Sequence, residues 1–444
     1  MDKGIDRRVF LKSSALTGMS FGLAASGLGG IARASANGKV VLAVVGIRSR
    51  GKELIGHFGG VQDCVIKYVV DVDARYLGDA AKKAEEKQGS RPEELRDFRV
   101  ALADKDVDGI VIATPDHWHA PMSIEALKAG KHVYVEKPCG HNPKEGELLV
   151  AAAKKYGKLV QMGNQRRSTV VGNQLVREVQ EEKIIGEVYY AWTWYANSRG
   201  PIGYGKVVDV PEYLDWDLWQ GPAPRVEYRS NVHPYNWHWF WHWGTGEALN
   251  NGTHELDVAR WAMGLNYPVK VTSVGGRWHY PGQDDWECYD TQQLTCEFGE
   301  GKAIAWQGLS SNNYAPEGIH RGVRLHGTEG TIVYDGNWYK VFDKDNKLVK
   351  EVGKQTEASG ANTVDPGIRD NHAGNFVDGI LGRSPISSPV EEGHKSVLLG
   401  HLGNIAARVG RTLHCDAKDG HIVGDEEAMG LWGRSYEPGW EVGI

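Results

Sequence analysis

Residues 39–51, KVVLAVVGIRSRG, determine the fold of the first half of this chain. The apolar run from residue 40 to 45 has no polar break, which is typical of a parallel strand buried on both faces. It ends in Gly46-Ile47-Arg48-Ser49-Arg50-Gly51, which follows the dinucleotide pattern G-x-G-x-x-G except that Arg48 replaces the middle glycine. We predict a nucleotide-binding turn that includes Ser49, in which Arg48 or Arg50 can place a guanidinium group on a phosphate.

Further apolar runs alternate with helix-like stretches as far as residue 163. The strand-like runs are CVIKYVVDVD, DGIVIATPD, KHVYVEKP and KLVQMGN, and the helix-like stretches cover residues 74–87, 119–129 and 143–156. This alternation predicts a doubly wound parallel sheet, a Rossmann domain, over residues 37–163. Asp71 ends the second strand, where a carboxylate can accept hydrogen bonds from an adenosine ribose. The alternative is that Asp71 or Asp73 only caps a helix.

The pattern changes after Gly163. A helix-like stretch at 172–182 leads to GEVYYAWTWYA, to a segment rich in Pro, Gly and Trp, and to a helix at 254–263. Strand-like runs from 269 to 342 are joined by turns that contain Gly, and helical patterns at 368–381 and 393–409 follow. We therefore predict an α/β chain whose second domain, 164–444, has a large, mostly antiparallel sheet.

The N-terminus has the pattern of an export signal. Arg7 and Arg8 precede Phe10-Leu11-Lys12, an uncharged run and Ala32-Arg33-Ala34, which predicts a twin-arginine signal peptide over residues 1–34. The alternative is an uncleaved membrane anchor. We expect a periplasmic or otherwise exported protein that has no membrane span once the signal is removed.

Composition narrows the possible functions. Of the 444 residues, 41% are hydrophobic and 24% charged, and the net charge of −6 argues against nucleic acid and anionic membranes as partners. The five cysteines are scattered, so we expect reduced core residues. The chain has 16 Trp but only 8 Phe, which fits either sugar-stacking surfaces or a Trp-rich core.

The stretch ATPDHWHAPMSIEALKAGKHVYVEKPCGHNPKEGELL closely resembles the Gfo/Idh/MocA oxidoreductase family. The resemblance extends over the mature chain through YLDWDLWQGPAP, GTHELDVARWAMG and HAGNFVDGILGRSPISSPVEEGHKSVLLGHLGNIA, and Glu136-Lys137-Pro138 is its most specific mark. It implies a Rossmann domain that holds a nicotinamide dinucleotide, a C-terminal α/β domain that holds a sugar, and homo-oligomers, as dimers or tetramers, that pair through the C-terminal sheets.

Lys137 follows a strand, on the edge of the sheet where ligands bind. Its ammonium group can hydrogen-bond the hydroxyl that is oxidised, or can shuttle that proton if the lysine pKa is lowered. The alternative is a surface lysine. By resemblance, Pro138 lies against the nicotinamide, and Thr114, Pro115 and His119 line the cofactor cleft.

His254 and Asp257 open the helix at 254–263. In dehydrogenases of the family, the matching His works as acid or base beside an Asp four residues earlier, but here that residue is Asn250. A carboxylate raises the pKa of an imidazole, whereas an amide only orients it. We therefore expect Asn250 to orient a neutral His254 that serves as a base, and the alternative is a structural histidine.

Further substrate candidates lie in the second domain. We expect NWHWFWHWGTGE to be extended, with Trp237, Trp239, Trp241 and Trp243 on one face, as a sugar-binding wall or as a core strand. Arg166 and Tyr195 are weaker candidates, chosen from their domain alone. His238 and His242 have the spacing of a metal pair but lack a third ligand, so we expect no metal.

A protein that folds before export can take up its dinucleotide in the cytoplasm. We therefore expect a tightly bound, noncovalent NAD, with NADP as an open alternative, that is restored within each catalytic cycle. The main hypothesis is an oxidoreductase acting on a sugar, polyol or glycoside. The alternatives are a glycoside hydrolase or lyase, in which C3 oxidation allows elimination before the hydride returns, and a non-catalytic sugar-binding descendant of the fold.

Overall fold

The computed structural model describes residues 38–354 and 366–444. The predicted signal peptide lies outside the described residues. Within them, no helix is both long and apolar enough to cross a membrane.

The first half forms a six-stranded, all-parallel sheet in the order β3-β2-β1-β4-β5-β6. Its strands are β1 (Val40–Val45), β2 (Cys64–Val70), β3 (Glu93–Leu95), β4 (Gly109–Ile112), β5 (His132–Val135) and β6 (Val160–Met162). All the strands predicted from apolar runs are present, so the doubly wound sheet is confirmed. Of the strands in this sheet, only β3 was not predicted, because it is a short edge strand whose residues are mostly exposed.

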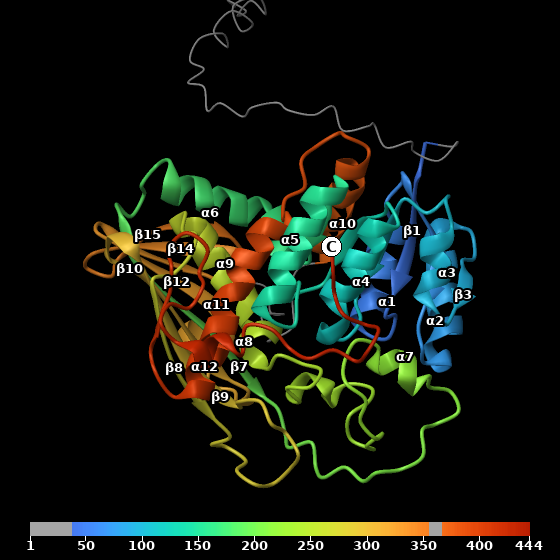
Figure 1. Cartoon of the computed structure of the whole chain (residues 1–444). Helices are drawn as coiled ribbons and strands as arrows, with labels where there is room; N and C mark the ends of the chain where they lie inside the picture. Colours follow the sequence, from blue (N-terminus) through green and yellow to red (C-terminus); the bar gives the residue numbers. More distant parts are fainter. Residues whose placement is uncertain (1–37, 355–365) are drawn as a thin grey trace, which may run out of the picture. The chain divides into compact units, whose positions relative to one another are not determined.

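Helices cover both faces of this sheet (Figure 1). One face packs on α1 (Arg50–Gly59), α2 (Leu77–Gln88) and α10 (Pro366–Ile380), and the other on α3 (Phe98–Ala103), α4 (Asp116–Lys128) and α5 (Pro143–Tyr156). The Asn142 side chain caps α5 by accepting from the Glu145 amide, and Gly157 ends the helix in a left-handed conformation. Because α10 comes from the C-terminal half of the chain, that half also contributes to the Rossmann core.

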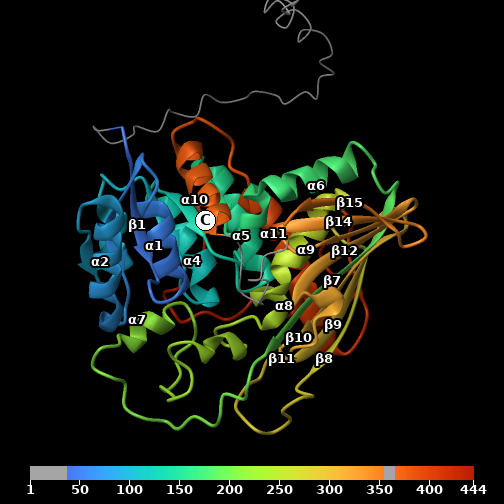
Figure 2. The ribbon, with the colours of Figure 1, turned by 180° about the vertical axis from the view of Figure 1, so that it is seen from behind.

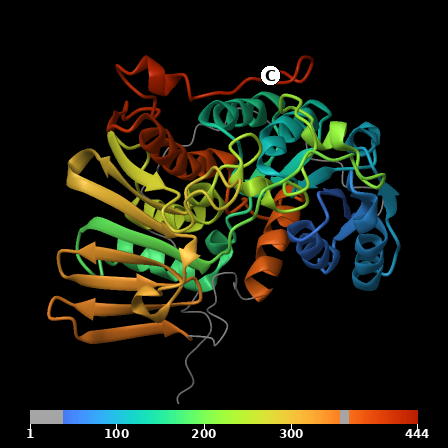
Figure 3. The ribbon, with the colours of Figure 1, turned by 90° about the horizontal axis from the view of Figure 1, so that it is seen from below.

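The second sheet has ten strands, with the path β15-β14-β13-β12-β7-β10-β9-β8-β16 and β11 paired to β7. Its bounds are β7 (Val188–Ser198), β8 (Lys270–Gly276), β9 (Thr291–Phe298), β10 (Lys302–Leu309), β11 (Ser311–Asn312), β12 (Arg321–Gly327), β13 (Gly330–Tyr334), β14 (Trp338–Asp343), β15 (Leu348–Gly353) and β16 (Leu413–His414). The prediction of a mostly antiparallel sheet is confirmed, since only β7 and β10 pair in parallel. Figures 2 and 3 show these strands side by side.

One face of this sheet packs on α6 (Val170–Gln180), α9 (Gly252–Met263) and α11 (Val390–Val409). The chain between β7 and α9 holds only short helices, α7 (Trp216–Gln220) and α8 (Glu247–Asn250), together with a 3-10 turn at Asn236–Trp239. The last short helix of the chain is α12 (Glu426–Met429). All five cysteines are buried and free, as expected.

The segment 199–246 folds around its own cluster of aromatic side chains. Its core includes Trp216, Trp219, Trp237 and Trp243. Trp216 stacks on Trp219 with ring centroids 4.6 Å apart. Much of the Trp excess therefore builds a core, which was one of the two readings of the composition. We call this segment the Trp-rich segment.

Backbone hydrogen bonds join the Trp-rich segment to the Rossmann domain. Ala74 N donates to Tyr213 O at 3.0 Å, Asp215 N to Val72 O at 3.1 Å and His117 N to Trp243 O at 3.2 Å. The indole nitrogen of Trp118 also donates to Trp219 O at 2.9 Å. The segment is thus fastened at several points along the carboxyl ends of the parallel strands.

Candidate active site

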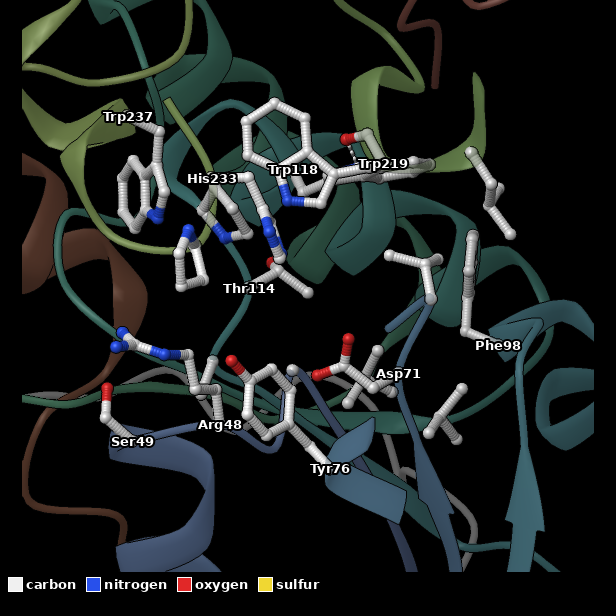
Figure 4. A pocket seen from close by; sticks show the side chains of 18 of the residues that line it. Arg48, Ser49, Asp71, Tyr76, Phe98, Thr114, Trp118, Trp219, His233 and Trp237 are labelled. Atoms are coloured by element: carbon white, nitrogen blue, oxygen red, sulfur yellow. Dashed lines mark hydrogen bonds between the residues drawn. The ribbon is translucent and has the colours of Figure 1, made fainter. Parts of the chain in front are cut away.

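The first of two adjoining cavities opens at the carboxyl ends of β1, β2 and β4. The strand order reverses between β1 and β4, and doubly wound sheets bind their ligands at that point. The Trp-rich segment supplies the opposite wall, including Trp219, His233 and Trp237 (Figure 4). The residues that we predicted for the nucleotide and that line this cavity are Gly46, Arg48, Ser49, Asp71, Thr114 and Pro115.

The turn after β1 needs both of its glycines. Gly46 has a φ of 79°, and a Cβ atom there would lie 2.6 Å from the carbonyl group of Ala113. A Cβ on Gly51 would overlap the carbonyl oxygen of Gly46. The two glycines therefore keep the turn tight against β4, although Gly51 itself does not line the cavity.

The two arginines of the turn face different groups. The guanidinium of Arg48 lies 5.7 Å from the centre of the Tyr235 ring, beside the first cavity. Arg50 instead donates to Glu136 at 2.8 Å and to Glu53 at 2.9 Å. Arg48 is therefore the better placed of the two to meet a phosphate in this cavity, because Arg50 does not line it.

Asp71 is held by backbone amides and does not cap a helix. Its carboxylate oxygens accept from Ile47 N and Asp73 N, both at 2.9 Å, whereas Asp73 caps the turn Ala74–Tyr76 by accepting from Arg75 N. Burial raises the pKa of Asp71 to about 6, although these amides oppose the shift. Figure 4 shows the carboxyl group beside Tyr76 in the cavity. The position fits a ribose and not a cap.

The second cavity, of about 360 Å³, adjoins the first and shares Ser49, Thr114, Tyr235 and Trp237 with it. The predicted residues that line it are Ser49, Arg50, Thr114, His119, Glu136, Lys137, Asn250 and His254. The structure therefore brings Lys137, from the end of β5, together with His254, from the first turn of α9. We call this cavity the catalytic cleft.

Lys137 is tied to Asn250. Its Nζ donates to the backbone oxygen of Asn250 at 2.5 Å and to the side-chain oxygen at 3.1 Å. Burial lowers the pKa of Lys137 and Arg321 lowers it further, although Glu136 and Asp116 oppose them. The amine is therefore easier to deprotonate than that of an exposed lysine.

The expectation that Asn250 orients His254 is wrong. The Asn250 amide oxygen faces Lys137, and its nitrogen donates to Glu247 Oε1 at 3.2 Å. The reason is a break in the helix, because Asn250 ends α8 while His254 lies in α9. Asn251, between the two helices, has φ −118° and ψ −41°.

His254 has no hydrogen bond to either ring nitrogen from any residue that the structure describes, and its ring lines the cleft. Burial lowers the pKa of His254 well below its ordinary value, and the positive charges of Arg321 and Lys137 lower it further. The imidazole is therefore neutral near pH 7, as expected, and a neutral ring can accept a proton.

Charged residues that the sequence analysis missed complete the cleft. Asp116 accepts from Thr245 Oγ1 at 2.6 Å, and burial raises the pKa of its carboxyl group. Arg199, directly after β7, and Arg321, the first residue of β12, also line the cleft. Asp116 could have been found from its place at the start of the helix that follows β4. Neither arginine has such a local signal, because only the pairing of distant strands brings it there.

Glu247 lies behind the cleft and organises it. Its side chain is 3% exposed, and it accepts from Arg199 at 3.0 Å, from Ser310 at 3.1 Å and from both Asn250 and Asn251. A carboxylate is therefore present one turn before Asn250, and Asn250 connects it to Lys137.

Several predicted site residues line neither cavity. The carbonyl oxygen of Pro138 hydrogen-bonds His119 Nδ1 at 2.6 Å, which holds the loop in place. Arg166 pairs with Glu255 at 3.2 Å and Asp257 pairs with Arg167 at 2.8 Å, so both belong to buried ion pairs.

Tyr195 also lies behind the cleft. Its hydroxyl oxygen accepts from Asn197 at 2.7 Å and from Arg199 at 3.2 Å, and its ring is completely buried. It therefore supports Arg199 and does not contact the cavity.

The prediction of an extended Trp wall is wrong. The stretch begins with the 3-10 turn Asn236–Trp239 and continues through further turns, so the four indoles do not share a face. Trp239 stacks on Trp286 at 4.1 Å, Trp243 is part of the Trp-rich core, and Trp241 lines a separate cavity. Trp237 alone of these four lines the cleft. The sequence spacing could not show this, because the turns arise from packing in the segment.

The two histidines of the stretch bind carbonyl groups. His238 Nδ1 lies 2.6 Å from Tyr235 O, and His242 Nε2 lies 2.8 Å from Pro224 O. Across residues 38–354 and 366–444, no group of three or more His, Cys, Asp or Glu side chains could hold a metal ion.

Sequence comparison finds similar proteins. A glycosyl hydrolase family 109 protein from Shewanella sp. (strain ANA-3) is 35% identical over 154 residues, which is 30% of this chain and 34% of that protein. The chain thus matches about a third of the length of this relative. Another family 109 protein, from Stenotrophomonas maltophilia (strain K279a), is 26% identical over 347 residues, 73% of each chain.

Structure comparison finds the same fold in levoglucosan dehydrogenase, solved in complex with NADH and levoglucosan. The TM-score is 0.64 at 19% identity, over 85% of this chain and 99% of the other. At this identity, the match shows the fold alone.

Family profiles cover nearly all of the described chain. Residues 41–164 match the NAD-binding Rossmann fold of the Gfo/Idh/MocA oxidoreductase family, and residues 168–442 match a C-terminal alpha/beta domain of that family. The chain therefore belongs to the Gfo/Idh/MocA oxidoreductase family.

Proposed function

We propose that this protein is an NAD-dependent oxidoreductase that acts on a sugar, polyol or glycoside and keeps its cofactor through each catalytic cycle. The observation that carries the proposal is the position of Lys137, whose amine lies in a polar cleft that adjoins the nucleotide cavity. The family assignment agrees with it.

The residues of the first cavity fit a dinucleotide. The turn at Gly46 lies against the backbone of Ala113, which leaves no room for a side chain there. The Thr114 hydroxyl is buried without a hydrogen-bond partner among the described residues. Asp71 would accept from the ribose hydroxyls, Arg48 would meet the phosphates, and Thr114 and Pro115 would line the path toward the cleft. Gly51 would keep the turn close to the pyrophosphate.

Asp71 favours NAD over NADP. A carboxylate at the ribose position repels a 2′-phosphate. Arg96, which also lines this cavity, donates to Val72 O at 2.7 Å and to Tyr213 O at 3.1 Å, so its guanidinium is already engaged.

The Trp-rich segment supports tight, noncovalent retention of the cofactor. It forms one wall of the nucleotide cavity and is held to the Rossmann domain by the backbone hydrogen bonds described above. Release would require several of these bonds to open together. Retention in turn suits export of a folded protein by the twin-arginine route to the periplasm, which we propose from Arg7 and Arg8.

When bound, a nicotinamide would supply reversible hydride transfer with a sugar carbon. Lys137 hydrogen-bonds the reacting hydroxyl and, with its lowered pKa, can take the hydroxyl proton. Glu136 keeps Arg50 paired beside it, and the His119 ring fixes the loop through Pro138. Asn250 orients the Lys137 amine through its two hydrogen bonds. We propose Lys137 and His254 as the catalytic residues.

Arg199, Asp116 and Arg321 are proposed to hold the hydroxyl groups of the substrate. Arg166, Tyr195 and Asp257 support the wall of the cleft from behind and do not touch the substrate. Trp241 is not part of this site.

A second candidate function is a redox-neutral glycoside hydrolase or lyase. His254 favours it, because its ring lines the cleft without a hydrogen-bond partner among the described residues, so a ring nitrogen is available to take a carbon-bound proton next to an oxidised carbon. Similarity to two family 109 proteins agrees with this version.

Single-turnover kinetics on a panel of free sugars and aryl glycosides tests the proposal. Growth of the reduced-nicotinamide absorbance with a free sugar supports the oxidoreductase, and aglycone release without net nucleotide change supports the alternative. Absence of both reactions across the panel would favour a non-catalytic sugar-binding protein.

We also propose a homo-oligomer, a dimer or tetramer, that pairs through the large sheet. The face of this sheet away from the helices carries an aromatic group, with Trp192 stacked on Trp194 at 4.8 Å beside Trp338 and Phe342. Light scattering after size-exclusion chromatography should give a multiple of the 49.0 kDa chain, and a monomer at micromolar concentration would refute the pairing.

A further inference from the structure

A separate cavity of about 220 Å³ lies where the start of α5, the second half of α11 and residues 431–434 meet. It shares no lining residue with the nucleotide cavity or the catalytic cleft. Its volume exceeds the ~30 Å³ share of one water in the liquid several-fold, so it can hold a small organic molecule. We call it the α11 cavity.

Polar atoms in the wall of the α11 cavity lack partners. Asn142 is only 5% exposed, and its amide nitrogen has no hydrogen bond among the described residues, while its oxygen caps α5. The Nη1 atom of Arg434 is also buried and unpaired, although its other nitrogens donate to Glu145 at 2.8 Å and to His117 O at 2.7 Å. Buried polar groups in proteins are rarely left unpaired, so two free donors in one wall indicate that a water molecule or a ligand accepts from them.

His141 adds an acceptor to the same wall. Its Nε2 lies 3.1 Å from the carbonyl oxygen of Gly244, which can only accept, so Nε2 carries the hydrogen. Nδ1 of the neutral ring is then an acceptor, and it is buried without a partner among the described residues. A hydroxyl group of a ligand can donate to it.

The charge of the α11 cavity is positive. No Asp or Glu lines it, and the charge of Arg434 is balanced by Glu145. Arg408 is exposed, forms no ion pair with any described residue, and lies 5.3 Å from the centre of the Trp241 ring. Glu287 accepts from Trp241 N but does not line the cavity. Arg408 therefore remains as a cation beside an indole face, with no carboxylate in contact with it among the described residues.

We propose that the α11 cavity is a second ligand site, for a hydroxylated monocarboxylate such as a sugar acid. The carboxylate meets Arg408 and the free donors of Arg434 and Asn142, a hydroxyl donates to His141 Nδ1, and the C–H face of the ligand packs on Trp241.

The site lies behind the catalytic cleft. Asn404, in its wall, donates to Thr245 O at 2.9 Å, and Thr245 Oγ1 donates to Asp116, which lines the cleft. His141 follows the Lys137–Pro138 loop by only a few residues. An occupant would therefore contact Asn404 and Thr245, which support Asp116, without entering the cleft.

Isothermal titration calorimetry of the full-length protein with sodium D-gluconate tests the proposal. We expect gluconate to bind at least tenfold more tightly than acetate, which lacks hydroxyl groups, and more tightly than neutral sorbitol. Arg408→Gln should weaken gluconate binding at least tenfold. Arg411→Gln, a nearby exposed arginine outside the cavity, is the matched control and should leave it unchanged.

Lys137→Ala separates this site from the catalytic cleft, because gluconate binding should persist in that variant. The proposal is overturned if wild type gives no binding heat at millimolar gluconate, or if acetate binds as well as gluconate. It is also overturned if Arg408→Gln binds normally, or if Lys137→Ala alone abolishes binding, because the ligand then lies in the cleft. None of these outcomes affects the oxidoreductase proposal, which is read from cofactor absorbance.

Discussion

Replacing Asn250 with Asp tests the contact that most distinguishes this cleft. The Asn250 amide oxygen lies 3.1 Å from Lys137 Nζ, so Asn250→Asp places a carboxylate directly beside the amine. Coulomb's law with an effective dielectric constant near 20 gives about 5 kcal/mol at this distance as an upper bound, and opposite charges this close shift pKa values by about 1–3 units. Glu247 repels the new carboxylate, so we expect the Lys137 pKa to rise by about 1–2 units.

The sign of the effect on rate follows from the role of the amine. Lys137 accepts a proton in its neutral form, and its pKa is now below the ordinary value because of burial. Raising that pKa leaves less neutral amine at a given pH. The acid limb of the kcat/KM profile should therefore move by about 1–2 units to higher pH.

The assay is the second-order rate constant for cofactor reduction by a verified sugar, measured in single turnover at subsaturating sugar from pH 5 to 10. Asn251→Asp is the matched control, since the Asn251 side chain also donates to Glu247 but makes no hydrogen bond to Lys137. Both variants should lose about 1–3 kcal/mol of stability, because a donor to Glu247 is lost. Only Asn250→Asp should move the acid limb. An unmoved limb, or an equal shift in Asn251→Asp, would refute the role given to this pair.

Three further predictions concern single residues. Lys137→Ala should retain the cofactor but convert substrate about 10²-fold more slowly in steady-state assays. Normal turnover of substrate by this variant would show that Lys137 is not catalytic. Asp71→Asn should lower the ratio of NAD to NADP affinity about tenfold or more, because the charge that repels a 2′-phosphate is lost. Equilibrium titrations of cofactor-free protein measure this ratio, and an unchanged ratio would contradict the ribose assignment. Gly46→Ala should abolish cofactor retention, since its Cβ would collide with the Ala113 carbonyl, and a fully loaded variant in absorbance spectra would rule out the tight turn.

Local patterns were sufficient to predict the Rossmann half. The apolar runs, the turn glycines and Asp71 can each be recognised from the residues next to them in the sequence. The structure has the corresponding strands and turn. The Glu136-Lys137 element was likewise predicted to follow a strand, and both residues line the cleft.

Long-range packing decided what the sequence could not show. The direction of the Asn250 side chain depends on a break at Asn251, which the spacing of residues in one helix cannot reveal. Trp241 was placed on an extended segment that is in fact built from turns. Arg321 reaches the cleft only because β12 pairs with β7, and these two strands are far apart in the sequence.

The proposed function depends on a cofactor that stays with the protein, so the ratio of cofactor to protein after purification is the decisive measurement. Protein purified without added nucleotide should be dialysed extensively and precipitated with acid, and the supernatant analysed by mass spectrometry. We predict close to one noncovalent NAD(H) per chain. Protein that contains no nucleotide, and that takes up NAD only at millimolar concentration, would show that the cofactor is not retained.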